Sequence, residues 1–219
     1  MRGPELLPAL PSPPPLPASD LASLENRTDI AVLDTRSRDA FFEGHLTGSL
    51  LTELDYQFCS IAGSYVPEGT PIYLVVDQSR VDEAVRALIR VGLDRIAGYI
   101  TPETLAEYGR RAGSLRRTTT IDMATLEAER VSGRAHVLDV RGLAEFDAGH
   151  VADALHVPHT RIGINVDTLP VDKPLLVYCN SGARSAAAVA MLARLGFNVV
   201  DVNDHFANYR RVEQVAARA

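Results

Sequence analysis

Short apolar runs rich in β-forming residues alternate along the second half of the chain with segments of helical character. Residues 136–140 and 175–178 are apolar runs of strand length, and another run spans residues 199–202. The Ala-rich stretch 186–195 predicts a helix that stops at Gly196, because glycine is the usual residue after a helix end. Apolar strands separated by helices predict a mostly parallel sheet covered by helices on both faces, an α/β fold.

A set of landmarks occurs twice along the chain. Asp34-Thr35-Arg36, Phe41 and Gly44-His45 recur 105 positions later as Asp139-Val140-Arg141, Phe146 and Gly149-His150. The apolar run 72–76 matches 174–178 at a slightly different offset. A preserved order with a small drift in spacing indicates a duplication. We therefore expect two tandem domains, one over residues 20–112 and one over residues 118–219, each a mostly parallel sheet flanked by helices.

The start of the chain has a different composition. Residues 1–19 are rich in proline, which fixes φ and lacks an amide donor, so this tail is expected to be extended, poorly ordered and linker-like. Its apolar residues are interrupted by prolines and an acid, unlike those of a signal peptide. No stretch approaches the roughly 20 apolar residues of a membrane span. We expect a cytoplasmic protein with no membrane association.

Composition and charge exclude several classes of function. The chain has 46% hydrophobic and 23% charged residues and a net charge of −6. This balance argues against a nucleic-acid partner, which needs a basic face, but allows an anionic substrate in a locally positive pocket. The two cysteines, Cys59 and Cys179, form no Cys-x-x-Cys motif, so a zinc ribbon is excluded and a reducing compartment is the simpler interpretation.

The segment around Cys179 carries the chemistry. A predicted buried strand ends at Cys179, a short glycine-containing turn follows, and a helix begins at about Arg184. The helix N-terminus, the turn amides and the Arg184 guanidinium all favour a bound anion, so Cys179 is expected to react as a thiolate nucleophile. The alternative is a small buried apolar cysteine, which most free cysteines are. The Cys179 loop is defined here as residues 179–185.

These motifs resemble the rhodanese family in order and spacing, over roughly residues 20–219 as two copies. The resemblance rests on Leu138-Asp139-Val140-Arg141, Glu145-Phe146, Gly149-His150-Val151 and the Cys179 loop. It implies a sulfurtransferase that moves a sulfane sulfur from thiosulfate or a low-molecular-weight persulfide to Cys179, and then to a thiol or cyanide. It implies Cys179 as the nucleophile and Arg184 as anion binder, with the substrate cradled by Asn180, Ser181, Gly182, Ala183, Arg184 and Ser185.

Two details refine this interpretation. Four residues separate Cys179 from Arg184, whereas phosphatases with a cysteine nucleophile have five, so the loop length favours sulfur over phosphate. The family commonly has a Gly-Gly pair and a later tryptophan after the next strand, but here the segment 203–209 contains neither. The choice of sulfur donor is therefore open, and His205 in this segment is interpreted as an exposed loop residue.

The proline-rich start followed by two copies also resembles the C-terminal part of bacterial fusions that begin with a metallo-β-lactamase-fold domain, some of them persulfide dioxygenase–sulfurtransferases. The chain has no His-x-His-x-Asp-His motif, and the pair His156 and His159 is given no metal role. We expect no metal and no cofactor. The alternative function is a non-catalytic or sulfur-relay module that docks onto a separate hydrolase or dioxygenase of that fold.

The first copy lacks the nucleophile. Asp77 stands at the position of Cys179, and the loop after it has no glycine. We therefore expect an inactive structural or docking domain. The Asp-x-Arg and Gly-His pairs of both copies are interpreted as scaffold, because polar groups near a core are usually there to satisfy hydrogen bonds. Cys59 has no basic neighbour in the sequence and is expected to be an inert thiol.

Overall fold

Nine strands form two parallel sheets in the computed structural model, which describes residues 10–111 and 115–209. The first sheet has the order β2-β1-β3-β4, and the second has the order β5-β9-β8-β6-β7. The predicted α/β class with parallel sheets is confirmed. The strands are β1 (Ala31–Asp34), β2 (Leu50–Leu51), β3 (Ile72–Val75), β4 (Ile96–Ile100), β5 (Thr120–Ile121), β6 (His136–Asp139), β7 (Leu155–His156), β8 (Leu175–Tyr178) and β9 (Val199–Val202).

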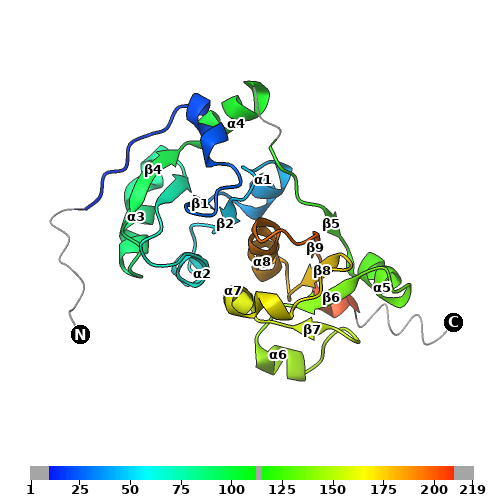
Figure 1. Cartoon of the computed structure of the whole chain (residues 1–219). Coiled ribbons are helices and arrows are strands. Elements are labelled where there is room, and N and C mark those ends of the chain that lie inside the picture. Colours follow the sequence, from blue (N-terminus) through cyan, green and yellow to red (C-terminus); the bar gives the residue numbers. More distant parts are fainter. Residues whose placement is uncertain (1–9, 112–114, 210–219) are drawn as a thin grey trace.

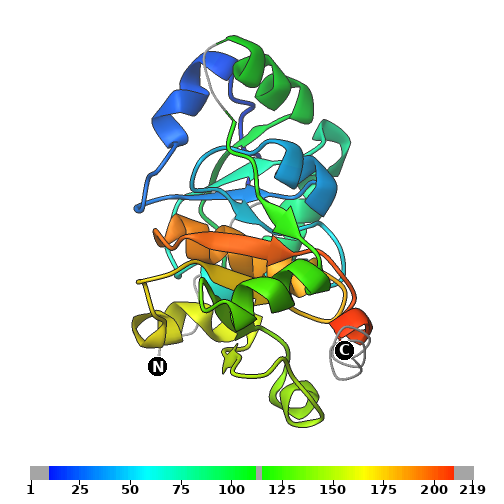
Figure 2. The ribbon, with the colours of Figure 1, turned by 90° about the vertical axis from the view of Figure 1, so that its right-hand side faces the viewer.

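Helices cover both faces of each sheet, as Figures 1 and 2 show. The α-helices are α1 (Arg38–Glu43), α2 (Phe58–Tyr65), α3 (Val81–Ile89), α4 (Pro102–Arg111), α5 (Met123–Val131), α6 (Leu143–Asp147), α7 (Ile162–Asn165) and α8 (Ala183–Arg194). The 3₁₀-helices are η1 (Ala18–Leu24), η2 (Gln78–Arg80), η3 (His159–Arg161) and η4 (Val166–Thr168). No helix of the described residues combines the length and the apolar character needed to cross a membrane.

The two sheets have matching topology, because β1, β2, β3 and β4 occupy the places of β6, β7, β8 and β9. The place of β5 is taken in the first domain by the proline-rich segment. Pro15 forms a parallel bridge with Tyr99, whose N–H donates to Pro14 O at 3.0 Å, and Leu16 N–H donates to Tyr99 O at 2.8 Å. Residues 14–16 are therefore extended, as expected, but they are paired with the edge of β4. The expected tail at residues 1–9 lies outside the described residues.

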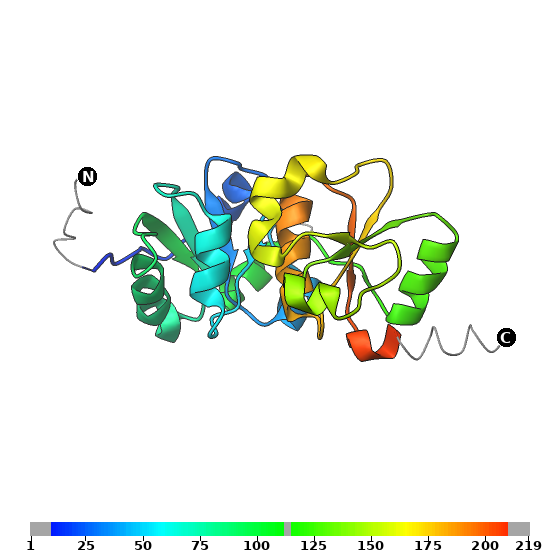
Figure 3. The ribbon, with the colours of Figure 1, turned by 90° about the horizontal axis from the view of Figure 1, so that it is seen from below.

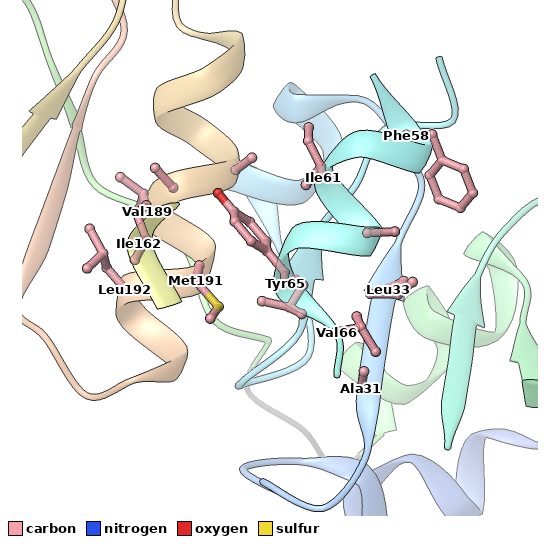
Figure 4. Close-up of a cluster of buried hydrophobic side chains, with 14 of the residues drawn as sticks. Ala31, Leu33, Phe58, Ile61, Tyr65, Val66, Ile162, Val189, Met191 and Leu192 are labelled. Carbon is pink, nitrogen blue, oxygen red and sulfur yellow. The ribbon is translucent and has the colours of Figure 1, made fainter. Parts of the chain in front are cut away.

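The parts of the chain around the first and the second sheet, called here the first and the second domain, share one hydrophobic core. Strand side chains alternate between faces: Leu175, Val177 and Cys179 belong to this shared core, whereas Leu176 and Tyr178 belong to the core on the opposite face of the sheet. The shared core also contains residues of β1, β3, α2 and α3 from the first domain. Figure 4 shows the Tyr65 side chain of α2 pointing towards α8, near Met191, and both residues belong to this core.

Helix α8 lies at this boundary and is buried on nearly all sides (Figure 3). Ala186 and Ala190 pack against Phe41, Phe42 and Leu51 of the first domain. Alanines let the two domains approach closely, because they carry little side-chain volume between the backbones. At the other end of α8, the Arg194 guanidinium donates to Gly48 O and Ile30 O, both at 2.6 Å. The first domain thus holds the helix that follows the Cys179 loop.

Candidate active site

Cys179 lies where the fold leaves a strand and enters a helix. Strand β8 ends at Tyr178, and α8 begins at Ala183 after a turn of four residues. Gly182 is the residue before the helix and has φ = 95°, a left-handed conformation that glycine adopts without a steric penalty. The turn places Cys179 at the carboxyl end of a central parallel strand, where α/β proteins commonly bind ligands.

The sulfur of Cys179 has polar contacts within its own loop. The Gly182 N–H donates to Cys179 Sγ at 3.2 Å, and Ser185 Oγ lies 3.7 Å from the same sulfur. Cys179 is buried, with 1% of its surface exposed. An N–H group at a helix N-terminus is a favourable partner for a negatively charged sulfur. Of the predicted cradle, Gly182 and Ser185 therefore contact the sulfur, while Asn180, Ser181 and Ala183 are exposed at the rim.

The Arg184 guanidinium is paired with a carboxylate. Its guanidinium forms a two-pronged ion pair with Glu145 of α6, at 2.5 and 2.8 Å. This ion pair lowers the pKa of Glu145 to about 2 and is the main cause that raises the pKa of Arg184, with a smaller contribution from Cys179. Arg184 is thus close to the sulfur, but its charge is largely balanced. The anion-binding role expected for Arg184 stays a prediction, and it requires a substrate to compete with Glu145.

Asp201 is a buried acid behind the loop. It is a register partner of Val177, so its side chain faces the same side of the sheet as Val177 and Cys179. It is fully buried, and neither carboxylate oxygen has a hydrogen bond of normal geometry within the described residues. Burial raises its pKa to about 7, and the nearby Ser185 hydroxyl and Arg38 guanidinium offset only part of this effect. The carboxyl therefore holds a proton below neutral pH.

The segment 203–209 does contact the Cys179 loop, although it lacks the family's Gly-Gly pair. The Phe206 N–H donates to Asn180 O at 3.0 Å, which ties the segment to the rim of the loop. Asn203 Oδ1 would lie 3.1 Å from a Cβ placed at Gly182. His205 is exposed, in line with its interpretation as a loop residue.

Arg38 of the first domain donates a hydrogen bond to the Cys179 loop. The Arg38 Nη1 donates to Ser181 O at 3.2 Å, and a Cβ placed at Gly182 would overlap the Arg38 guanidinium. The absence of a side chain at Gly182 thus makes room for Arg38. Sequence reasoning did not identify this residue, since nothing near Arg38 in the chain points to a loop about 140 positions away. Asp201 did carry a signal, as an acid within the apolar run 199–202.

The equivalent loop of the first domain is a closed polar turn. Asp77 accepts hydrogen bonds from the N–H of Ser79 at 2.8 Å and from its hydroxyl at 2.5 Å. Arg80 forms an ion pair with Glu83 at 2.8 Å in the first turn of α3. The Asp77 carboxylate therefore serves as a cap, and the turn offers no thiol.

The repeated polar pairs have the same geometry in both domains. The Arg141 guanidinium forms a bidentate ion pair with Asp139 and donates to Gly149 O at 2.8 Å. The Arg36 guanidinium pairs with Asp34 in the same way and donates to Gly44 O at 2.8 Å. His45 and His150 each stack on a phenylalanine and hydrogen-bond its carbonyl oxygen through Nδ1. The contacts of Asp34, His45, Asp139 and Arg141 satisfy buried polar groups near the carboxyl ends of β1 and β6, in accord with the scaffold interpretation. Cys59 lies on α2, with Sγ 3.4 Å from Ala87 O.

The part of the chain that contains the Cys179 loop is similar to known proteins. Residues 122–211 match the model of the rhodanese-like domain. The chain is 39% identical over 64 residues to a sulfurtransferase of Allochromatium vinosum, a match that covers 29% of this chain and 60% of that protein. It is 35% identical over 66 residues to thiosulfate sulfurtransferase GlpE of Pseudomonas savastanoi pv. phaseolicola, covering 30% of this chain and 62% of that protein. The chain thus matches less than two thirds of the length of these relatives.

Solved structures include similar chains. A rhodanese-related protein from Thermoplasma volcanium is 33% identical, with a TM-score of 0.40 over 42% of this chain and 91% of that one. Thiosulfate sulfurtransferase from Pseudomonas aeruginosa is 19% identical, with a TM-score of 0.38 over 91% of this chain and 42% of that one.

Proposed function

We infer that this chain, which contains a rhodanese-like domain and has sulfurtransferase homologues, transfers a sulfane sulfur through a persulfide on Cys179. The observation that carries the proposal is the position of the thiol. Cys179 directly follows strand β8, and its Sγ accepts a hydrogen bond from the Gly182 N–H at 3.2 Å. The donor is thiosulfate or a low-molecular-weight persulfide, and the acceptor is a thiol or cyanide. Cys179 is the nucleophile, and residues 180–185 bind the substrate.

The reaction with a persulfide R–S–SH balances without an oxidant. The Cys179 thiolate attacks the outer sulfur, a new S–S bond forms, and the S–S bond of the donor breaks. R–S⁻ leaves with the bonding electron pair, while the transferred sulfur keeps its proton on Cys179. In the second half, an acceptor thiolate attacks that outer sulfur and releases the Cys179 thiolate. Thiol exchange of this kind depends on the thiolate form of the attacking group.

The first domain is the inactive partner in this proposal, because Asp77 offers no thiol. A cytoplasmic location would keep the free Cys179 reduced between turnovers. The predicted docking onto a metallo-β-lactamase-fold hydrolase or persulfide dioxygenase stays a prediction. Co-purification of the full chain with such a protein would test it.

The decisive experiment measures the intermediate. The full chain is incubated with thiosulfate or glutathione persulfide, and peptide mass spectrometry locates any added sulfur atom. We expect one added sulfur on Cys179, none in Cys179→Ala, and an unchanged adduct in Asp77→Ala. Folded protein that gains no sulfur on Cys179 with either donor would refute the proposal. If Asp77→Ala gains no sulfur while Cys179→Ala still gains one at another residue, the active domain is wrongly assigned.

A further inference from the structure

The Cys179 loop has two arginines beside it, and they differ in how fully their charges are balanced. Arg184 is forked onto Glu145 by two short hydrogen bonds. Arg38 belongs to the other domain, donates to the neutral carbonyl of Ser181, and has its nearest acidic contact at 3.6 Å, to Asp39. Three quarters of the Arg38 side chain is covered and one quarter is exposed. Unlike Arg184, the Arg38 guanidinium is thus not held in a close forked ion pair.

Arg38 lines a cavity of about 310 Å³ at the boundary between the domains. The cavity walls comprise four residues of the first domain and two of the Cys179 loop, namely Ser37, Arg38, Asp39, Glu53, Ser181 and Ala183. Ser181 and Ala183 flank Gly182, whose N–H contacts Cys179 Sγ. The two loop residues in the cavity wall therefore lie on either side of the residue whose N–H contacts the reactive sulfur.

The charges of the cavity are mixed. The Glu53 carboxylate accepts the backbone N–H of Arg38 at the start of α1, and the Asp39 side chain is 81% exposed. One guanidinium thus lies beside two carboxylates. An inorganic dianion such as thiosulfate would meet Arg38 together with two like charges. A group that carries a carboxylate and an ammonium on the same carbon atom can pair with both signs.

We propose that this cavity is a donor subsite for the zwitterionic amino-acid group of a low-molecular-weight persulfide. The donor carboxylate pairs with Arg38, and its ammonium faces Asp39 and Glu53. In cysteine persulfide, the carbon that carries both charged groups is the second carbon from the inner sulfur. This short separation suits a subsite next to the Cys179 loop. The inference rests on the proposed sulfur transfer and narrows its donor. It also gives the inactive domain a role, because four of the six wall residues come from it.

The test compares two probes that differ by one group. Cysteine persulfide has the carboxylate, and cysteamine persulfide lacks it. Adduct formation on Cys179 is followed in the wild-type chain and in Arg38→Gln, with KM and kcat for each probe. We expect Arg38→Gln to raise KM for cysteine persulfide about tenfold or more, because a hydrogen-bonded charge pair is lost. KM for cysteamine persulfide is expected to stay within about twofold, as the lost pair does not involve it.

Arg27→Gln is the matched control. Arg27 is in the same domain and pairs with Asp29, away from the cavity walls. It should leave both donors unchanged. An equal loss for both probes in Arg38→Gln would mean that Arg38 only supports the loop, and no loss for either would also overturn the subsite. In both cases, an adduct on Cys179 would keep the sulfurtransferase proposal intact. No adduct with these probes or with thiosulfate would refute both proposals.

Discussion

Replacing Asp201 by asparagine should stabilise the protein, and by more at high pH. The side chain is fully buried, and burial raises its pKa from the ordinary 3.8 to about 7. Between these two values the folded protein keeps the proton and the unfolded chain releases it. The contribution of Asp201 to the free energy of unfolding therefore falls as the pH rises from about 4 to 7 and then stays level, by the linkage between proton binding and folding. Asparagine has nearly the same shape and cannot ionise.

The size of the effect follows from the same linkage. The difference between a pKa of 3.8 and about 7 corresponds to about 4 kcal/mol when the carboxyl is ionised in both states, at pH 8. At pH 5 only the unfolded chain is ionised, and the penalty falls to about 2 kcal/mol. Asp201→Asn should thus exceed the wild type in stability by about 4 kcal/mol at pH 8 and about 2 kcal/mol at pH 5.

Urea unfolding of both proteins at pH 5 and pH 8 measures these differences. Comparing variant with wild type at each pH cancels the titration of all other groups. Asp167→Asn, at an exposed position of the same domain, serves as the control and should change stability by less than about 0.5 kcal/mol. A stability difference for Asp201→Asn that is equal at both pH values would refute the reasoning. So would a variant less stable than the wild type at pH 8.

Two further substitutions test the domain boundary and the loop. Tyr65→Phe should raise the free energy of unfolding in urea by about 1 kcal/mol. The Tyr65 hydroxyl is buried without a hydrogen-bond partner among the described residues and points towards α8 (Figure 4). A lower free energy of unfolding would contradict this. Glu145→Gln should lower the KM for thiosulfate several-fold, since Arg184 is freed to bind the anion, and an unchanged or higher KM would show that Arg184 does not meet the donor. Its cost in stability at pH 7 should stay below about 1 kcal/mol, because Glu145 is 40% exposed, and the pair should weaken only as the pH falls from 4.5 towards 2.

Local pattern predicted the elements around the Cys179 loop well. The run 175–178 is strand β8, the run 199–202 is β9, and the helix expected to stop at Gly196 ends at Arg194. Buried parallel strands are short continuous apolar runs, and a left-handed glycine ends a helix, so both features are written in neighbouring residues. The turn between Cys179 and the helix could be located for the same reason.

Charge partners could not be predicted in this way. Arg184 was interpreted as an anion binder from its place in the loop, but its partner Glu145 is brought to it from α6 by the fold. The proline-rich tail was expected to be extended and poorly ordered, whereas its residues 14–16 are hydrogen-bonded to the edge of strand β4. In each case the local residue type is informative, while the contact depends on a surface formed by distant parts of the chain.

The amino-acid sequence alone determines the α/β class and the thiol that follows a buried strand, and it predicts a duplication, because periodicity and glycine positions act over a few residues. The tertiary structure decides what surrounds that thiol. Helix α8 is packed against the first domain through small alanine side chains, and this contact brings Arg38 to Ser181. The fold also buries Asp201 on β9, whose raised pKa depends on the exclusion of water. Burial and long-range pairing arise only when the two sheets pack together, so the loop can be found from the sequence but its electrostatic setting cannot.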